Sequence, residues 1–378
     1  MGFLVQGGAP PDDSVTTAKI QDDAVTSAKV AAGVLPGKNL IINSDFGIWQ
    51  RGTAFPAAAN GLYTVDRYKV TRIGAGVFDV DQDTSVPAND SAFSVKLTVS
   101  TADASVASGD LGFFHQRIEA NNTSLLALGT GDATSISVSF WARSSVTGVF
   151  TAFLQNSAQD RTYPHEFSIA QADTWEQFSY NLTGDVSGTW LSGTNGIGLI
   201  AGICLWAGSD FQGTNDTWNA GGKPATSNLP DTWINSSGAT FYLSRFQVEV
   251  GSAASDFEHR DYASELARCS RYFFQYNQNT GPYQREHWGT HNVSTTQSDV
   301  AIQYPVAMRA GPTFSTGASV DDWRINGASC SAIPATVNVI HEAACRVRFT
   351  VASGLVLNEA AFIDARVAGA KLVFDAEL

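Results

Sequence analysis

Alternation of apolar and polar residues with a period of two dominates the chain between residues 38 and 260. In the segment SVKLTVS, Val95, Leu97 and Val99 alternate with polar residues, and the segment 136–140 repeats the pattern with serines between its apolar positions. Gly, Asn and Asp residues, which favour turns, lie between such segments. This combination is typical of half-buried strands, so the pattern predicts an all-β fold of the sandwich or barrel type.

One predicted strand changes phase along its length. In FYLSRFQVEV at 241–250 the apolar residues have odd numbers up to Leu243 and even numbers from Phe246 onward. An extra residue in the strand would keep both sets on the buried face, so a β-bulge is expected near Ser244.

A single segment has helical spacing. In DYASELARCSRYFFQY, Leu266, Cys269 and Phe273 follow the spacing i, i+3, i+7. The spacing predicts one short amphipathic helix, or a helical turn that runs into a strand at Tyr272. This segment separates the sandwich from a C-terminal part, residues 261–378, in which RVRFTV alternates again and KLVFDAEL is expected to form the last strand.

The first 37 residues contain an internal repeat. DDSVTTAKI at 12–20 is followed ten residues later by DDAVTSAKV at 22–30. Each copy is too short and too polar to bury a face alone, so the repeat would become ordered only against other chains. We expect residues 1–37 to be a stalk for docking and oligomerisation, and a flexible polar linker is the alternative.

Charge and hydropathy narrow the range of partners. The chain has 378 residues with 36 acidic and 23 basic side chains, which gives a formal net charge of −13. Nucleic acids and anionic membrane surfaces require clustered Lys and Arg, so neither is expected as a partner. No apolar run approaches the roughly 18 residues of a membrane-spanning helix, and no secretory signal is indicated. We expect no membrane insertion.

The cysteines and glycines carry no site chemistry in this interpretation. Cys204, Cys269, Cys330 and Cys345 show no CxxC spacing, so we expect small buried side chains instead of a zinc site or disulfides. A GxGxxxG arrangement at 196–202 resembles a nucleotide-binding loop, but it lies inside the apolar run GIGLIAGICLW. That run predicts a strand, whereas a dinucleotide loop must open a helix.

No catalytic constellation stands out, and we expect the protein not to be an enzyme. Glycosidases need two carboxylates roughly 5–10 Å apart, and Asp160 with Glu166 is one pair that the sequence does not exclude. Asp79, Asp81 and Asp83 would share one face of a strand. No cofactor is expected, with a structural calcium ion at these three aspartates as the alternative.

The segment 206–235 combines aromatic side chains with Asp, Asn, Thr and Gly. Sugars present apolar ring faces and many hydroxyls, which aromatic rings and polar side chains match together. The alternative is that these tryptophans fasten a long loop to the sandwich, and a glycan site would then lie near Trp288 and Trp323. The candidate carbohydrate-binding residues are Trp206, Asp210, Phe211, Asn215, Asp216, Trp218 and Trp233.

Several segments resemble bacteriophage tail-fibre and receptor-binding proteins. KNLIINSDFGIWQRGT at 38–53 and YTVDRYKV at 63–70 are similar to the opening of a module in such proteins. Residues 246–273, FQVEVGSAASDFEHRDYASELARCSRYF, are similar to its closing phrase. The terminal FDAEL and the N-terminal repeat are also similar to parts of phage fibres.

The resemblance implies a homotrimeric virion protein with three parts. Residues 1–37 would dock to other tail or baseplate proteins, 38–260 would form a jelly-roll domain like a carbohydrate-binding module, and 261–378 a smaller β domain at the tip. Such a protein is assembled in the bacterial cytoplasm and resides in the virion tail fibre.

We therefore expect attachment of the virion to a host-surface polysaccharide through weak contacts that act together. Two alternatives remain open. One is a head or baseplate decoration without receptor contact. The other is a capsule or lipopolysaccharide depolymerase, which would predict a long parallel β-helix that the sequence does not indicate.

Overall fold

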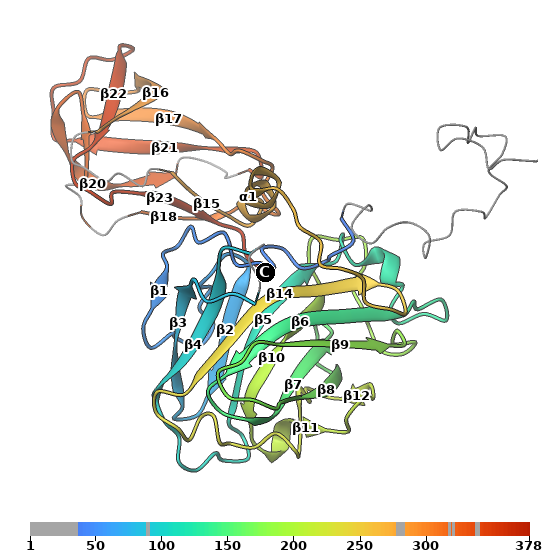
Figure 1. Ribbon diagram of the computed structural model, residues 1–378. Coiled ribbons are helices and arrows are strands. Elements are labelled where there is room, and N and C mark those ends of the chain that lie inside the picture. Colours follow the sequence, from blue (N-terminus) through green and yellow to red (C-terminus); the bar gives the residue numbers. More distant parts are fainter. Residues whose placement is uncertain (1–36, 88–90, 277–283, 317–318, 320–321, 337–340) are drawn as a thin grey trace, which may run out of the picture.

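The computed structural model describes residues 37–87, 91–276, 284–316, 319, 322–336 and 341–378. Within these ranges strands predominate and one α-helix occurs, which confirms the predicted all-β fold with a single short helix. Figure 1 shows a larger unit of packed sheets and a smaller unit of strands, which meet beside the helix α1 (Tyr262–Ser270). Apart from Gly37, the predicted stalk lies outside the described residues.

The larger unit is a sandwich of two six-stranded antiparallel sheets, named here sheet I and sheet II. The chain crosses repeatedly between them, as in a jelly roll. Sheet I has the order β1 (Ala54–Phe55), β3 (Val77–Asp83), β4 (Ser94–Thr101), β14 (Thr240–Val250), β6 (Ile136–Ser144) and β9 (Glu176–Leu182). Sheet II has the order β12 (Asn219–Ala220), β8 (Arg161–Ile169), β7 (Gly148–Gln155), β10 (Ile197–Ala207), β5 (Leu111–Glu119) and β2 (Tyr68–Ile73).

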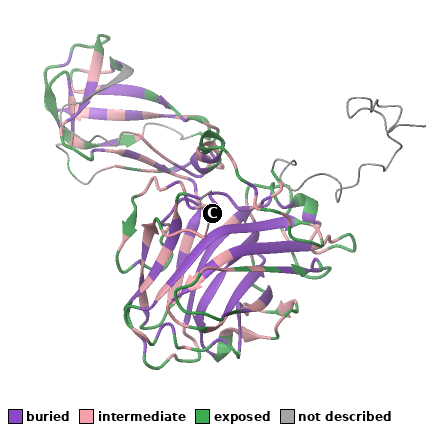
Figure 2. Ribbon diagram, in the orientation of Figure 1, coloured by how far each residue is buried: buried purple, intermediate pink, exposed green. Residues whose placement is uncertain are grey.

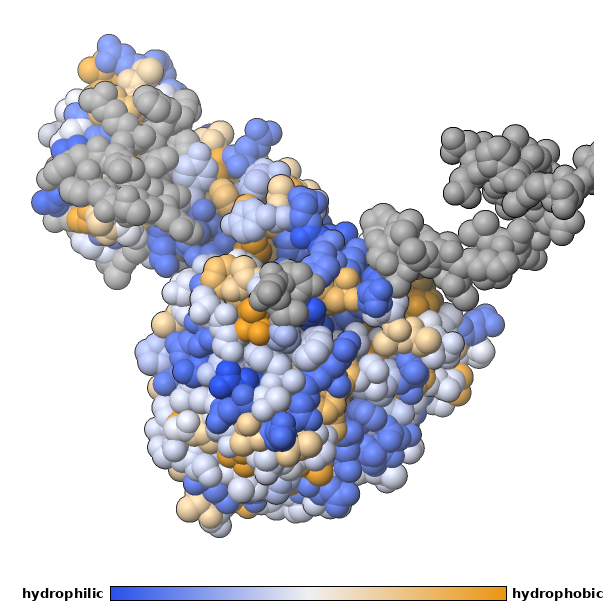
Figure 3. Space-filling view, viewed as in Figure 1, coloured by the Kyte–Doolittle hydropathy of each residue, from blue (hydrophilic) through white to orange (hydrophobic). Residues whose placement is uncertain are grey.

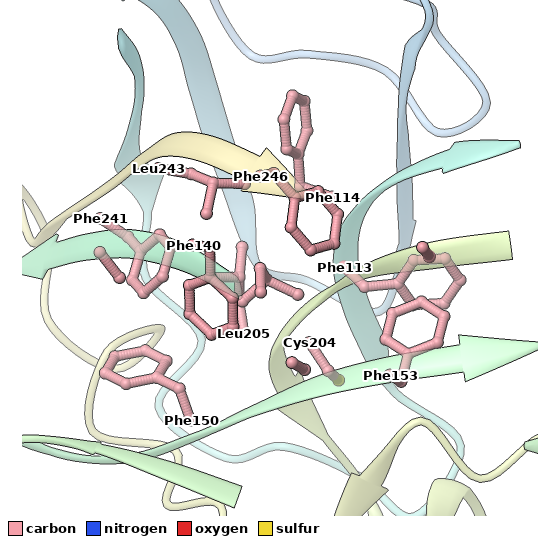
Figure 4. Close-up of a cluster of buried hydrophobic side chains, with 14 of the residues drawn as sticks. Phe113, Phe114, Phe140, Phe150, Phe153, Cys204, Leu205, Phe241, Leu243 and Phe246 are labelled. Carbon is pink, nitrogen blue, oxygen red and sulfur yellow. The ribbon is translucent and has the colours of Figure 1, made fainter. Parts of the chain in front are cut away.

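Apolar positions of the alternating segments face each other between the two sheets. Val95, Leu97 and Val99 of β4 are at most 1% exposed, as their alternation predicts. Figure 2 shows buried residues running along the inner strands, and Figure 4 shows phenylalanines from both sheets in one cluster. Within that cluster the rings of Phe150 on β7 and Phe241 on β14 have centroids 5.0 Å apart.

The predicted bulge in β14 is present. The register with β6 shifts between Ser244 and Gln247, and Arg245 has a φ of +52°. The extra residue lets Leu243 and Phe246 both point inward, and each is 1% exposed. Val250, the last residue of the strand, departs from the expected pattern because it is exposed, and the polar residues Gln247 and Glu249 of the other face are buried as well.

The glycine-rich apolar run forms strand β10, as predicted, and not a nucleotide-binding loop. A Cβ atom on Gly202 would lie 2.5 Å from the Cβ of His115 and 2.6 Å from the carbonyl oxygen of Phe114 on the neighbouring β5. Glycine is needed there because two strands approach closely.

The smaller unit is a closed six-stranded barrel with a three-stranded sheet beside it, which agrees with the expected C-terminal β domain. Trp323 is 0% exposed and belongs to its core. The barrel has the order β16 (Gln284–Asn292), β17 (Gln297–Gln303), β21 (Ala344–Val351), β20 (Ala328–Thr336), β19 (Trp323–Ile325) and β22 (Ala360–Ala365). The three-stranded sheet has the order β15 (Phe273–Tyr276), β23 (Leu372–Asp375) and β18 (Thr313–Thr316).

Helix α1 begins where the sequence indicated. The side chain of Asp261 accepts a hydrogen bond from the backbone N–H of Ser264 at 3.0 Å, which caps the helix N-terminus. Cys269 is buried with Ile42, Ile48 and Tyr272 in a small apolar cluster between the two units. All four cysteines are buried and free, as expected.

Buried charges hold this junction together. The carboxylate of Glu119 accepts hydrogen bonds at 2.7 Å from Arg271 Nη2 and from Tyr272 Oη. Glu258 and Arg260 also form a buried ion pair at 3.0 Å, so these junction charges are paired and not solvated. Among the described residues, no helix has the length and apolar character needed to cross a membrane.

Candidate functional site

Two of the predicted sugar-binding residues, Trp206 and Trp233, are core residues. They are 0% and 1% exposed, and their rings stack on each other with centroids 6.2 Å apart. Gly112 makes room for Trp206, because a Cβ on this glycine would lie 2.1 Å from the indole. As placed, neither ring can meet a ligand, so the prediction is wrong for these two residues and the fastening role fits them instead.

Asp210 and Phe211 lie in a short 3-10 turn, Ser209–Phe211, that follows β10. The Asp210 carboxylate accepts a hydrogen bond from Ser108 Oγ at 3.1 Å, and its carbonyl oxygen accepts one from Lys223 Nζ at 2.5 Å. Phe211 packs against the core. These residues fix the start of the loop, which continues through the short parallel pair β11 (Gln212–Gly213) and β13 (Ala225–Thr226).

The remaining candidates come together on the edge of sheet II. Strand β12 pairs with β8, so that Asn219 lies opposite Thr162, and the backbone N–H of Asp216 donates to the carbonyl of Pro164 at 3.0 Å. Because side chains alternate along strands, Asp216 and Trp218 share a face with the odd-numbered residues of β8. We call the resulting group the aromatic ledge, and its members are Tyr163, His165, Trp190, Asp216 and Trp218.

Aromatic contacts give the ledge its shape. The half-buried ring of Trp218 meets Tyr163 and Trp190 edge-on, with centroids 5.3 and 5.4 Å away. Its indole N–H donates to the carbonyl of Thr183 at 2.9 Å, which ties the loop to the end of β9. Trp190 and Trp218 are both half-buried, so the uncovered parts of their rings are apolar surface at this edge of the sandwich.

Polar groups of the ledge are largely engaged with each other. His165 Nδ1 lies 2.6 Å from Asp216 Oδ1, and the imidazole stacks on Tyr180 with centroids 3.9 Å apart. Asn215 Oδ1 accepts from the backbone N–H of Glu166 at 2.9 Å, and its amide donates to Asp216. Burial, reinforced by the nearby Asp216 carboxylate, raises the pKa of Tyr163 to about 12. The Asp216 side chain is still 50% exposed and can accept further hydrogen bonds.

A groove on the outer face of sheet I was not predicted from the sequence. It has a volume of about 610 Å³ and lies between strands β6 and β9 on one side and the segment 254–259 on the other. Trp141 of β6 lies on its floor with Ser139 and two residues of β9, Gln177 and Ser179. The sequence does hint at this groove. In the alternating segment ISVSFWAR, Trp141 takes a position that otherwise carries polar, outward-facing residues.

The three aspartates considered for calcium lie along the outer side of β3. Asp79 Oδ1 accepts from the backbone N–H of Ala57, and Asp83 Oδ1 accepts from that of Ser85, both at 2.7 Å. Burial, together with the neighbouring Asp79, raises the pKa of Asp81. Within the described ranges, no three His, Cys, Asp or Glu side chains are grouped to hold a metal ion.

Asp160 and Glu166 do not form a catalytic pair. Asp160 precedes β8 and Glu166 lies inside it, so six residues of extended chain put them roughly 20 Å apart. Each carboxylate has its own partners: Asp160 accepts from Asn156 at 2.6 Å, and Glu166 accepts from Thr226 at 2.5 Å. The separation is well beyond the roughly 5–10 Å of glycosidase acid pairs.

No family model matches the sequence, and the search of curated proteins found no match. Among solved structures, the arabinose-bound α-L-arabinofuranosidase MgGH51 is similar with a TM-score of 0.33 and 14% identity over 58% of this chain and 27% of its own. An enzymatically active domain of bacteriophage CBA120 tailspike protein 4 is similar with a TM-score of 0.30 and 12% identity over 52% and 22%. The carbohydrate-binding module TmCBM61 in complex with β-1,4-galactotriose is similar with a TM-score of 0.28 and 11% identity over 57% and 99%.

This chain thus spans about a quarter of the length of the first two structures. Likeness of this extent assigns neither a ligand nor an activity to it. The expectation that the protein is not an enzyme is withdrawn; two of the similar structures are an arabinofuranosidase and an enzymatically active tailspike domain. That expectation rested only on the lack of a local motif, whereas catalytic carboxylates can come together from distant segments.

Proposed function

We propose that this protein is a phage virion protein that attaches the particle to a host-surface glycan, and that the aromatic ledge contacts the sugar. The observation that carries the proposal is the pairing of two half-buried indoles, Trp190 and Trp218, beside the half-exposed carboxylate of Asp216. Sugar rings stack their apolar faces on aromatic rings and donate hydroxyl protons to carboxylates.

The opening and closing phrases that resemble phage fibres lie together in the structure. The backbone N–H of Leu40 donates to the carbonyl of Val248 at 2.8 Å, and that of Asn39 donates to the Glu258 carboxylate at 2.7 Å. The opening and closing phrases, about two hundred residues apart, therefore build the junction together. This supports a shared fibre architecture, with ligand specificity in the intervening chain.

The proposed partners follow from this architecture. Residues 1–37 would dock the protein to other tail or baseplate proteins and hold three copies together. Single protein–sugar contacts are weak, and three linked copies raise the apparent affinity by orders of magnitude when they engage one surface together. The virion tail fibre is the proposed location.

Trp218→Ala tests the ledge directly. We expect the variant to bind purified bacterial surface polysaccharides at least tenfold more weakly, since a lost aromatic contact of about 1.4 kcal/mol corresponds to that factor. Its midpoint of thermal unfolding should stay close to that of the wild type, because the ring is half-buried at an edge.

Trp206→Ala is the matched control. This buried indole should cost about 3–5 kcal/mol of stability on truncation, as buried aromatics do, and leave binding by the folded fraction unchanged. If Trp218→Ala and Trp190→Ala both bind every polysaccharide as the wild type does, the ledge is not the glycan site.

A further inference from the structure

We infer that the groove on the outer face of sheet I is a second, independent binding site for a neutral, hydroxyl-rich saccharide segment. This goes beyond the proposed function, because none of the groove residues belongs to the aromatic ledge. The groove lies on sheet I, whereas the ledge lies on the edge of sheet II.

Strand register arranges the floor of the groove. In the pairing of β6 with β9, Ser139 lies directly opposite Ser179 and Trp141 lies opposite Gln177. Directly paired residues have Cβ atoms about 4.5–5.5 Å apart, so the four side chains form a compact patch. One large ring beside an amide and two hydroxyls is the mixture that a sugar ring recognises.

The polar groups of this patch are uncommitted. Within the described residues, the side chains of Ser139, Gln177 and Ser179 make no hydrogen bond, nor does the indole N–H of Trp141. The neighbouring Ser137, by contrast, donates to Asn181 at 2.8 Å. A saccharide could therefore form hydrogen bonds with these groups without first breaking hydrogen bonds within the protein, which favours binding.

The opposite wall is fixed in advance. Ser255 donates from its backbone N–H to Glu249 at 2.7 Å and accepts at its Oγ from Lys38 Nζ at 2.6 Å. Glu258 donates from its backbone N–H to Gln247 Oε1 at 2.9 Å. Because both ends of the wall are tied to β14 and to the start of the sandwich, the groove exists before any ligand arrives. Preformed clefts of roughly 300–1,000 Å³ are typical of ligand sites.

Charge favours a neutral ligand. The exposed Asp256 carboxylate and the Arg245 guanidinium both line the groove, so one fixed negative charge and one fixed positive charge offset each other there. The guanidinium also donates from Nε to Ser91 Oγ at 3.1 Å. Figure 3 shows a largely hydrophilic surface on the side of the sandwich turned to the viewer, where β14, β6 and β9 lie in Figure 1.

The experiment compares three hexasaccharides, cellohexaose, isomaltohexaose and hexagalacturonate, by NMR titration of the full chain. We expect at least one neutral hexasaccharide to bind with a dissociation constant in the millimolar range or below, and hexagalacturonate to bind at least tenfold more weakly. Trp141→Ala and Gln177→Ala should each weaken the neutral interaction, the first at least tenfold. Ser179→Tyr should abolish binding of the neutral hexasaccharide, because the larger side chain fills the groove. Ser179 is exposed, so this variant should fold normally and keeps the test valid even if Trp141→Ala does not fold.

Ser168→Tyr, at an exposed position of β8 outside both the groove and the ledge, is the matched control for Ser179→Tyr and should keep the groove interaction. No binding of either neutral hexasaccharide, preference for hexagalacturonate, or binding unchanged in both Trp141→Ala and Ser179→Tyr would overturn the inference. Failure of the ledge proposal has a different signature, which is unchanged polysaccharide binding in Trp218→Ala and Trp190→Ala.

Discussion

Asp66 is a buried acid beside the junction of the two units. Its carboxylate accepts a hydrogen bond from the backbone N–H of Gln50 at 2.7 Å and pairs with Arg51 at 3.2 Å. Burial raises its pKa to about 6, against the opposing effect of Arg51. In the unfolded chain such a group ionises near pH 4. Between these values the folded protein holds more protons than the unfolded one, so stability falls as the pH rises.

Asp66→Asn isolates this effect, because the amide does not titrate. A pKa difference of about two units between the folded and unfolded states corresponds to a change of about 3 kcal/mol in the free energy of unfolding. We expect the wild type, compared with Asp66→Asn, to lose an amount of this order between pH 4 and pH 6.5. Urea unfolding of both proteins at the two pH values measures it. Parallel changes in wild type and variant would contradict the raised pKa of this group.

At the level of elements, the close approach of β10 and β5 depends on Gly202. A Cβ there would meet the backbone of Phe114 at 2.6 Å, and backbone cannot turn aside as a flexible side chain can. Gly202→Ala should therefore destabilise the sandwich by about 1–3 kcal/mol, as overpacking does. Chemical denaturation gives the value.

Gly131→Ala is the control for this change, since a Cβ at Gly131 meets nothing within 4 Å. Its effect should stay within about 0.5 kcal/mol. Equal stability of both alanine variants would mean that the strands separate more easily than the packing indicates.

Elements could be predicted from the sequence wherever one face of a strand is buried. Alternation located β4, β6, β21 and the bulge of β14, because the side-chain period of a strand is two. Trp206 was misassigned for a related reason. It ends the apolar run of β10, and continuing that run would have placed it in the core.

The site could be predicted only in part. Trp218 and Asp216 do lie together, but their partners Tyr163, His165 and Trp190 come from distant segments. Trp141 reaches the groove through pairing of β6 with β9, and the opposite wall comes from the segment after β14. Local patterns give the direction of a side chain, whereas tertiary pairing decides which side chains meet.

At the scale of the whole molecule, the C-terminal tail fastens the smaller unit to the sandwich. Figure 1 places the C-terminus at the junction, next to the sandwich. Glu377 pairs with Arg67, which is 0% exposed and stacks on Tyr272 at 3.4 Å, and it also pairs with Arg51 at 3.2 Å. The terminal Leu378 accepts a hydrogen bond from Arg117 at 2.8 Å. These three contacts between the sandwich and the tail thus rest on two residues that follow the last strand.

Removal of Glu377 and Leu378 should loosen this attachment. Arg67 would stay buried without its carboxylate, and losing one partner of a buried pair costs about 3–5 kcal/mol. We expect calorimetry of the shortened chain to show two separate unfolding transitions, with that of the sandwich at a lower temperature than in the full chain. Glu377→Gln, which removes only the charge, should give a smaller shift in the same direction. Glu359→Gln, at an exposed position on the barrel, should leave the melting profile unchanged. If the shortened chain melts in one step at the temperature of the full chain, the apolar cluster around Cys269 and the Arg271–Glu119 pair suffice to join the units, and the tail contributes nothing to that joint.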